Sequence, residues 1–265
     1  MKIALISLDQ FNKDRIANYK RCQQLVRISK TCGCEVAIFP EMTLTGYSLD
    51  VTSVSEPAGQ SESLEWFDAL SKEEGMHLIF GACLLNETSR QSQNVFCSAD
   101  PVRGVKQIYA KVHPFSFVGE EKVFTAGEGM GFVNLPEIRI GASICYDLRF
   151  PELYSAMANQ CQGAICIANW PAKRVNHWRI LLRARAIENQ MFMIGVNRIG
   201  CDGSGHYYEK SSIAVTPEGL IIDPLFSAPE LDIIEIDASH VQRYRNNFPT
   251  LKDKRFDLYQ KWAHG

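Results

Sequence analysis

The sequence has no long apolar run. No stretch approaches the roughly 18 to 20 apolar residues that a membrane-spanning helix needs. The first apolar segment, KIALISL, ends before Asp9 and has no small-residue cleavage site, so it predicts a strand and not a signal peptide. The formal charge of -2 gives no broad attraction to nucleic acid or to an anionic membrane. These absences favour a small molecule as the partner, with neither nucleic acid nor membrane.

The cysteines lack the spacing of a disulfide framework or a zinc site. There are nine of them, an odd number, and they are scattered through apolar segments. Cys32 and Cys34 are closer together than the usual zinc-binding pair, and no CxxC motif accompanies them. We therefore expect most thiols to be small buried side chains, no structural metal, and a reducing compartment such as the cytoplasm.

Apolar segments of strand length alternate with segments of helical periodicity. The N-terminal region predicts a strand, a helix and a second strand over residues 2–8, 12–31 and 35–39. Further strands are predicted over residues 77–85, 94–98, 105–110, 130–135, 138–144, 164–168 and 191–197. Further helices are predicted over residues 61–74, from 151 onward and over 175–186. This order is typical of an α/β protein.

The C-terminal third has a different pattern. Residues 211–216 and 220–222 flank a Pro-Glu-Gly turn and predict an antiparallel hairpin, with a strand over 231–236 as its neighbour. The polar and aromatic tail, residues 241–265, fits a surface helix or a contact with a partner subunit equally well. No low-complexity linker divides the chain, so we expect a single domain over residues 1–265, with two sheets inside helical layers.

Three polar residues follow predicted strands directly. They are Glu41 in FPEMTLTGY, Lys111 in YAKVHPF and Cys145 in GASICYDLRFPE. Strand ends are where α/β proteins place reactive side chains on loops held by a rigid scaffold. A nucleophilic thiol, a base and a cation together indicate thiol-based acyl chemistry. Taken singly, Glu41 is better explained as a loop cap, Lys111 as a surface charge and Cys145 as a core thiol. Only the three motifs together favour the catalytic interpretation.

These segments resemble the three signature regions of the nitrilase superfamily, the carbon-nitrogen hydrolases that use Glu, Lys and Cys. Similarity in ANWPA (168–172), ARAIENQ (184–190) and GVNRIG (195–200) extends the resemblance over nearly the full length, and the omega-amidase-like branch is the most similar. The resemblance implies a four-layer α-β-β-α sandwich and assembly as a homodimer or larger oligomer. It also implies cofactor-free cleavage of a non-peptide amide or nitrile through a cysteinyl thioester.

The chemistry of the triad supports this assignment. With ordinary pKa values of ~8.5 for Cys and ~4.3 for Glu, moving the thiol proton to Glu41 is uphill by ~6 kcal/mol. Lys111 beside the sulfur would favour the thiolate, and burial of Glu41 near a second carboxylate would make it a stronger base. Lys111 and the backbone N–H of Tyr146 would then stabilise the oxyanion. Glu41 would protonate the departing amine and later activate water.

The motif FVGEEKVFTAG supplies a candidate second carboxylate. Glu120 lies nine positions after Lys111 (120 - 111 = 9) and aligns best with the auxiliary Glu of the family, which favours it over the adjacent Glu121. The alternative is that both are solvated loop charges, since Glu is rarely buried. His113 is expected to satisfy a loop hydrogen bond and not to replace Glu41 as the base.

Substrate-binding residues are harder to assign. Arg149, four residues after Cys145, suits a bidentate contact with a substrate carboxylate, but an ion pair to Glu152 or another loop acid is an equal alternative. Trp170 is either a wall of the acyl pocket, as the resemblance implies, or a core side chain. The weaker candidates for substrate contact are Tyr47 and Phe117.

The leading hypothesis is an amidase that deamidates a small carboxylated amide, such as the omega-amide of an α-keto acid. The triad only makes the acyl-enzyme, so the pocket decides the substrate. The alternatives are an amidase of deaminated glutathione, a nitrilase, a carbamoyl hydrolase, an acyl transferase, or a non-catalytic binding protein on the same fold. A cation facing the sulfur would favour the carboxylated amide, and an apolar pocket would favour the nitrile.

Overall fold

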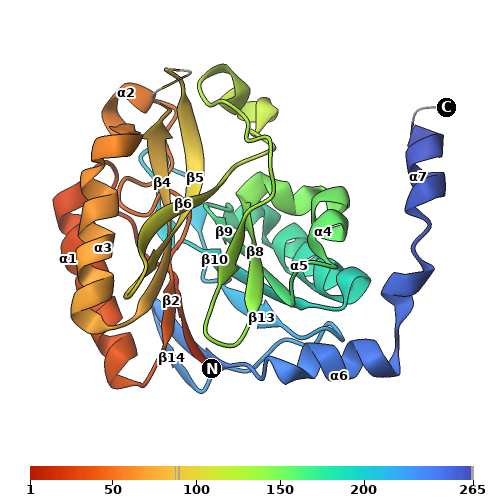
Figure 1. Cartoon of the computed structure of the whole chain (residues 1–265). Helices are drawn as coiled ribbons and strands as arrows, with labels where there is room; N and C mark the ends of the chain where they lie inside the picture. Colours follow the sequence, from red (N-terminus) through yellow and green to blue (C-terminus); the bar gives the residue numbers. More distant parts are fainter. Residues whose placement is uncertain (87, 89, 264–265) are drawn as a thin grey trace.

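The computed structural model describes residues 1–86, 88 and 90–263, and two packed β-sheets form its centre (Figure 1). The strands of the larger sheet are β1 (Lys2–Ile6), β2 (Val36–Ile38), β3 (Glu56–Pro57), β4 (His77–Leu85), β5 (Ser92–Asp100), β6 (Gly104–Ala110), β14 (Phe226–Ala228) and β15 (Leu231–Glu235). Those of the smaller sheet are β7 (Phe132–Asn134), β8 (Arg139–Ile144), β9 (Gly163–Ala168), β10 (Phe192–Asn197) and β13 (Ile213–Val215). A short hairpin of β11 (Gly200–Cys201) and β12 (Tyr207–Tyr208) stands apart.

Helices cover the outer face of each sheet. The larger sheet carries α1 (Arg15–Thr31) and α3 (Glu62–Glu74), and the smaller sheet carries α4 (Pro151–Met157) and α5 (Val175–Asn189), as Figure 1 shows. The short α2 (Val51–Val54) lies at one end. Local sequence signals set these helices: Pro151 begins α4, and Gly75 ends α3 with φ 59°, a left-handed conformation that suits glycine.

Three apolar clusters fill the spaces between the layers. The first lies between the two sheets and includes Ile38, Ile140 and Ile194. The second packs α1 and α3 on the larger sheet, and the third packs α4 and α5 on the smaller sheet. Every residue of β9 is buried because this central strand is covered on both faces. The predicted four-layer α-β-β-α sandwich is confirmed.

The strand order brings the predicted triad segments to one end of the sandwich. In the larger sheet β1 pairs β2 in parallel and β2 pairs β4 in parallel, and in the smaller sheet β8, β9 and β10 run parallel. Glu41 follows β2, and Cys145 follows β8. Gly81 in β4 permits the close approach of the Glu41 loop, since a Cβ atom there would lie 2.5 Å from the Met42 nitrogen.

The prediction for the C-terminal strands is partly wrong. β13 pairs with β10 at the edge of the smaller sheet, but residues 220–222 form only an isolated bridge, between Val215 and Ile221. The strand predicted over 231–236 is β15, and it lies in the larger sheet between β14 and β1, not beside that hairpin. Alternating apolar residues predict a strand but do not specify which sheet edge it will join.

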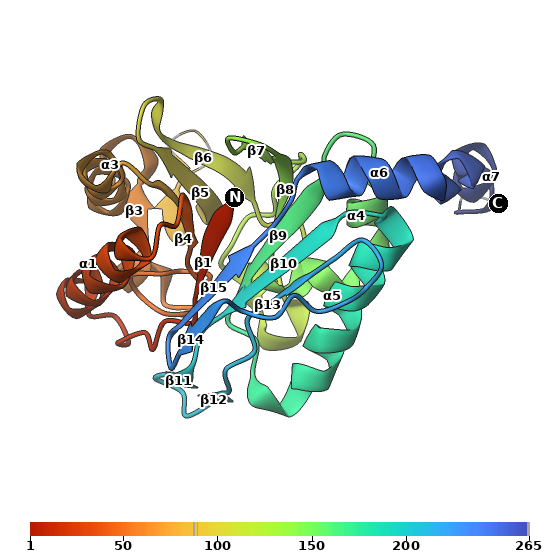
Figure 2. The ribbon, with the colours of Figure 1, turned by 90° about the horizontal axis from the view of Figure 1, so that it is seen from below.

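The C-terminal tail leaves the body of the molecule, as Figure 2 shows for α6 (Ser239–Asn247) and α7 (Phe256–Ala263). The Arg245 guanidinium anchors α6 by donating hydrogen bonds to the carbonyl oxygens of Ala158, Cys161, Asn189 and Gln190. No residue of α7 that the structure describes is buried, and Trp262 is 66% exposed. In the described part of the chain, no helix combines the length and the hydropathy needed to cross a bilayer.

Candidate active site

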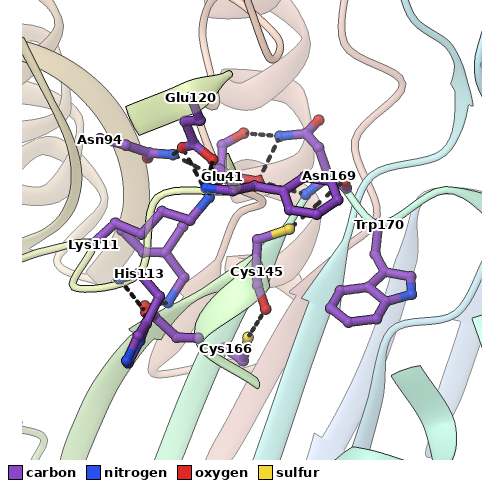
Figure 3. Close-up of polar contacts among 12 residues, drawn as sticks. Glu41, Asn94, Lys111, His113, Glu120, Cys145, Cys166, Asn169 and Trp170 are labelled. Carbon is purple, nitrogen blue, oxygen red and sulfur yellow. Dashed lines mark hydrogen bonds and ion pairs between the residues drawn. The ribbon is translucent and has the colours of Figure 1, made fainter. Parts of the chain in front are cut away.

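Four of the predicted site residues border one cavity of ≈ 440 Å³: Glu41, Lys111, Glu120 and Cys145. The Lys111 Nζ lies 3.2 Å from Glu41 Oε1 and 2.9 Å from each carboxylate oxygen of Glu120. Lys111 is 2% exposed, and both glutamates are fully buried. Figure 3 shows the Cys145 sulfur pointing toward this group. We call Glu41, Lys111 and Glu120 the charge cluster.

The structure separates Glu120 from its neighbour. Glu120 begins the 3-10 turn η3 (Glu120–Lys122), and its Oε2 also accepts a hydrogen bond of 2.7 Å from the backbone N–H of Phe115. Glu121 is exposed and lies outside the cavity. Of the two predicted alternatives, Glu120 is therefore the carboxylate beside Lys111, and the solvated-loop interpretation fits Glu121 alone.

Two asparagines hold the Glu41 carboxylate. Asn94 Nδ2 donates to Glu41 Oε1 at 2.7 Å and to Glu120 Oε1 at 3.3 Å. The backbone N–H of Asn169 donates to Glu41 Oε2 at 2.8 Å, and its side-chain Nδ2 donates to the Glu41 carbonyl oxygen at 2.8 Å. Neither asparagine was among the predicted site residues. The available signals were a polar residue inside an apolar strand for Asn94 and a strand-end position for Asn169.

The charge cluster contains two carboxylates and one ammonium group. Burial disfavours the charged lysine, but Glu41 and Glu120 outweigh this effect and raise the pKa of Lys111 well above its usual value. Burial and the nearby Glu41 raise the pKa of the Cys145 thiol well above its usual value. Lys111 does favour the thiolate, as predicted, but it is outweighed. Burial and Glu41 thus favour the neutral thiol of Cys145 over the thiolate.

Cys145, the predicted nucleophile, sits on a strained turn. Cys145 has φ 47° at the start of the 3-10 turn η4 (Cys145–Arg149), a conformation that non-glycine residues keep only where their surroundings hold it. Asp147 provides that hold. Its fully buried carboxylate accepts hydrogen bonds from the backbone N–H groups of Ile144 (2.9 Å) and His113 (3.1 Å) and from the Tyr109 hydroxyl (2.9 Å).

His113 belongs to the same network. Its Nδ1 lies 2.8 Å from Asp147 Oδ1, and its ring stacks on Phe150 with ring centroids 3.8 Å apart. His113 is absent from the lining of the cavity that holds Cys145. The expectation that His113 satisfies a loop hydrogen bond is confirmed.

The five predicted substrate-binding residues all line the cavity, in different settings: Tyr47, Phe117, Tyr146, Arg149 and Trp170. Trp170 is 3% exposed and packs on Trp178, so it is at once a cavity wall and part of the core. Burial raises the pKa of Tyr47, and its buried hydroxyl has no hydrogen-bond partner among the described residues. Phe117 is 86% exposed, so it contributes only to the rim.

Arg149 has no acidic partner in the part of the chain that the structure describes. Within residues 1–86, 88 and 90–263 it forms no ion pair with Glu152 or with any other acid, so the predicted structural alternative is wrong. Its guanidinium carbon lies 4.8 Å from the centroid of the Trp170 ring, and one of its nitrogens lies 3.4 Å from His177 Nδ1. Burial, together with the positive charge of Arg174, lowers the pKa of Arg149. A guanidinium without an acidic partner thus borders the cavity that contains the thiol.

The arrangement suits acyl transfer to sulfur. The described residues contain no group of three or more His, Cys, Asp or Glu side chains placed to hold a metal ion. The chemistry available at this site is that of the thiol, the charge cluster and the backbone N–H groups around them.

Comparisons with known proteins place the chain in a family. The carbon-nitrogen hydrolase family model matches residues 2–246. The omega-amidase YafV of Escherichia coli (strain K12) is 33% identical over 99% of each chain, and the 2-oxoglutaramate amidase of Bacillus subtilis (strain 168) is 30% identical over 85% of this chain and 86% of that protein. The CN-hydrolase superfamily protein XC1258 from Xanthomonas campestris superposes with a TM-score of 0.89 at 26% identity, over 96% of this chain and 97% of that one. The chain therefore belongs to the carbon-nitrogen hydrolase family of the nitrilase superfamily.

Proposed function

We propose that this protein is an amidase that hydrolyses a small carboxylated, non-peptide amide, such as the omega-amide of an α-keto acid, to the acid and ammonia. The observation that carries the proposal is the Arg149 guanidinium, which borders the cavity of Cys145 and has no acidic partner among the described residues. Guanidinium groups bind carboxylates through paired N–H donors. The similarity to an omega-amidase and a 2-oxoglutaramate amidase supports the same substrate class.

In the proposed acylation step, the Cys145 sulfur attacks the amide carbon while its proton passes to Glu41. The hydrogen bonds from Asn94 and Asn169 orient the Glu41 carboxylate for this transfer. Lys111 and the backbone N–H of Tyr146 stabilise the negative charge on the former carbonyl oxygen. The tetrahedral intermediate then collapses, the C–N bond breaks, and Glu41 returns its proton to the nitrogen. Ammonia leaves, and the acyl group stays on sulfur as a thioester.

The proposed second half-reaction uses the same groups. Glu41, again a carboxylate, takes a proton from water, whose oxygen attacks the thioester carbon. The oxyanion forms in the same place and is stabilised by the same donors. When the C–S bond breaks, the sulfur takes up the proton, which restores the neutral Cys145 thiol and releases the carboxylic acid. Glu120 keeps Lys111 charged and in place through both half-reactions.

Ammonia release and intact-protein mass test the function together. Purified protein is given α-ketoglutaramate, deaminated glutathione, aliphatic amides and nitriles, with the Cys145→Ala variant as the matched control. We expect ammonia from the carboxylated amides and a transient acyl adduct on the wild type, with neither from the variant. Preference for neutral nitriles would replace the amidase with a nitrilase. Ligand binding without ammonia or an adduct would show a non-catalytic protein.

We also propose that the protein is a homodimer in which α7 packs against a second copy of the chain. The aromatic side chains of α7 are strongly exposed, at 40% for Phe256, 48% for Tyr259 and 66% for Trp262. Exposed apolar patches of this kind mark protein interfaces. Light scattering should give twice the chain mass of 29.9 kDa for the wild type and the monomer mass for Trp262→Glu. A wild type that stays monomeric at high concentration would contradict the dimer.

We propose, in addition, that residues 1–265 form a single domain in a reducing compartment such as the cytoplasm. The cluster between the sheets joins strands from both halves of the chain, and all nine cysteines are free. Urea unfolding should give one transition by fluorescence and by circular dichroism. Alkylation in freshly lysed cells should modify nine thiols after denaturation, and a lower number would indicate oxidation.

A further inference from the structure

A second guanidinium borders the cavity beside Arg149. Arg174 ends the 3-10 turn η5 (Ala172–Arg174) between β9 and α5, whereas Arg149 ends η4 after the nucleophile. Arg174, like Arg149, forms no ion pair with an acid in the part of the chain that the structure describes. Two guanidinium groups from separate loops therefore line one cavity without an acidic partner.

The acids that border the cavity are already engaged. Glu41 and Glu120 bind Lys111. Asp202 accepts hydrogen bonds from the backbone N–H groups of Ser204 and His206 and from the Tyr208 hydroxyl. An anion that neutralises the charge of the two arginines must therefore be a group other than these three carboxylates.

Both guanidiniums are held in place before any ligand arrives. Arg149 lies over the Trp170 ring, and the guanidinium carbon of Arg174 lies 5.7 Å from the centroid of Phe115. The turn that carries Arg174 is tied down by Trp170, whose backbone N–H donates to Asn197 Oδ1 at 2.7 Å and whose ring N–H donates to the Arg174 carbonyl oxygen at 2.8 Å. Such preorganisation lowers the cost of binding a ligand.

The fold gains little from this pair. The positive charge of Arg174 contributes to lowering the pKa of Arg149, which is the mark of two like charges near each other. Arg174 also stands at the N-terminal boundary of α5, where the helix dipole disfavours a cation, and α5 has no acidic residue in its first turn. Residues whose local placement lowers the stability of the fold are expected mainly at functional sites.

We propose that Arg149 and Arg174 form a two-guanidinium clamp for the substrate carboxylate remote from the scissile amide. Arg174 then determines the preference for carboxylated over neutral amides. This inference rests on the proposed amidase function and extends it by a second specificity-determining residue. The planar N–H fork of each arginine matches carboxylate oxygens, so one carboxylate takes hydrogen bonds from both sides.

The test compares succinamate with butyramide, which have the same chain length and differ in a terminal carboxylate or methyl group. Loss of a hydrogen bond to a charged group typically changes an affinity by about 10- to 100-fold. We therefore expect Arg149→Gln and Arg174→Gln each to lower kcat/KM for succinamate about 10- to 100-fold, mainly through KM. The kcat/KM for butyramide should change less than about threefold in either variant. Arg174→Lys, which keeps the charge without the fork, should recover part of the loss.

The matched control is Arg179→Gln. Arg179 is on helix α5, which begins directly after Arg174, and it is exposed, pairs with Glu209 and lies outside the cavity lining. Its replacement should therefore leave kcat/KM unchanged for both amides. A double-mutant cycle of the clamp residues adds a further check. Two groups that bind the same carboxylate are energetically coupled. For succinamate only, the change in kcat/KM of the double variant should therefore differ from the product of the two single changes by at least about threefold.

A binding measurement separates failure of the clamp from failure of the amidase proposal. Succinate should slow alkylation of Cys145 by iodoacetamide in the wild type and should not do so in Arg174→Gln, and this requires no turnover. Protection by succinate without hydrolysis of either amide would overturn the amidase function and leave the clamp standing. Equal losses for both amides, unchanged succinamate kinetics in Arg174→Gln, or unchanged protection would overturn the clamp.

Discussion

Replacing Lys111 with Met tests the buried charge cluster directly. Met has a side chain of similar length but lacks the ammonium group that binds Glu41 at 3.2 Å and both oxygens of Glu120 at 2.9 Å. Two buried carboxylates then remain without a cation between them. Removing one partner from a buried ion pair typically costs about 3 to 5 kcal/mol, because the remaining charge is uncompensated. We expect a loss of this size in the free energy of unfolding near neutral pH, and no measurable turnover.

The same substitution should make stability depend on pH. In the wild type, the pKa of Lys111 is higher in the folded protein than in the unfolded chain, where it is about 10.4. The stability that Lys111 contributes is therefore fully present below about pH 10.4 and is lost only as pH rises through the higher pKa of the folded protein. In the variant, the two like charges favour binding of one proton, which the unfolded chain does not hold at pH 7. The deficit should therefore shrink as pH falls, by up to about 1.4 kcal/mol per pH unit, until the unfolded carboxylates titrate near about pH 4.3.

Urea unfolding at about pH 8 and about pH 5.5 measures both effects. The double variant Lys111→Met, Glu120→Gln retains only the Glu41 carboxylate, which Asn94 and Asn169 still hold. It should regain part of the stability, lose most of the pH dependence and stay inactive. A deficit below about 1 kcal/mol at pH 8, or one that is the same at both pH values, would refute this account of the cluster.

Three further predictions concern other parts of the structure. Burial alone would raise the pKa of Glu56, but hydrogen bonds from Ser61 and Ser63 outweigh burial and lower it. The stability that Glu56 contributes is therefore fully present above its pKa in the unfolded chain, about 4.3, and is lost as pH falls through its lower pKa in the folded protein. Glu56→Gln should therefore lose about 1.5 to 3 kcal/mol of unfolding free energy at pH 7 and converge with the wild type in acid, and a gap independent of pH would contradict this. Asp147→Asn should lower kcat and should lower the free energy of unfolding in urea by about 1.5 to 3 kcal/mol, because an amide nitrogen cannot accept the hydrogen bonds that Asp147 accepts. An unchanged kcat would show that this network does not position Cys145. Because the pKa of Cys145 is raised, its alkylation rate, followed by peptide mass, should still be climbing at about pH 9, and a plateau below about pH 8 would be inconsistent.

Much of the fold was predictable because its signals are local. The strand predicted over residues 77–85 is β4 with the same bounds, and Gly75 ends α3 as predicted. Alternation, helical periodicity and capping residues each act over a few neighbours, so a single sequence carries them. The partner of β15 was not predictable, since pairing with β1 joins residues more than 200 positions apart and depends on which sheet edge remains open.

The sequence by itself predicted the kind of chemistry, because a thiol, a carboxylate and an amine at three strand ends are suited to act as nucleophile, base and cation. Only the tertiary structure decided which neighbours complete the site. Glu120 and Glu121 are adjacent and chemically identical, yet one turn buries the first against Lys111 and leaves the second in water. Asn169 meets Glu41 across 128 positions of the chain. Arg149 lacks an acidic partner among the described residues because of how separate loops pack. Contacts of this range arise from packing of whole layers, which no local pattern encodes.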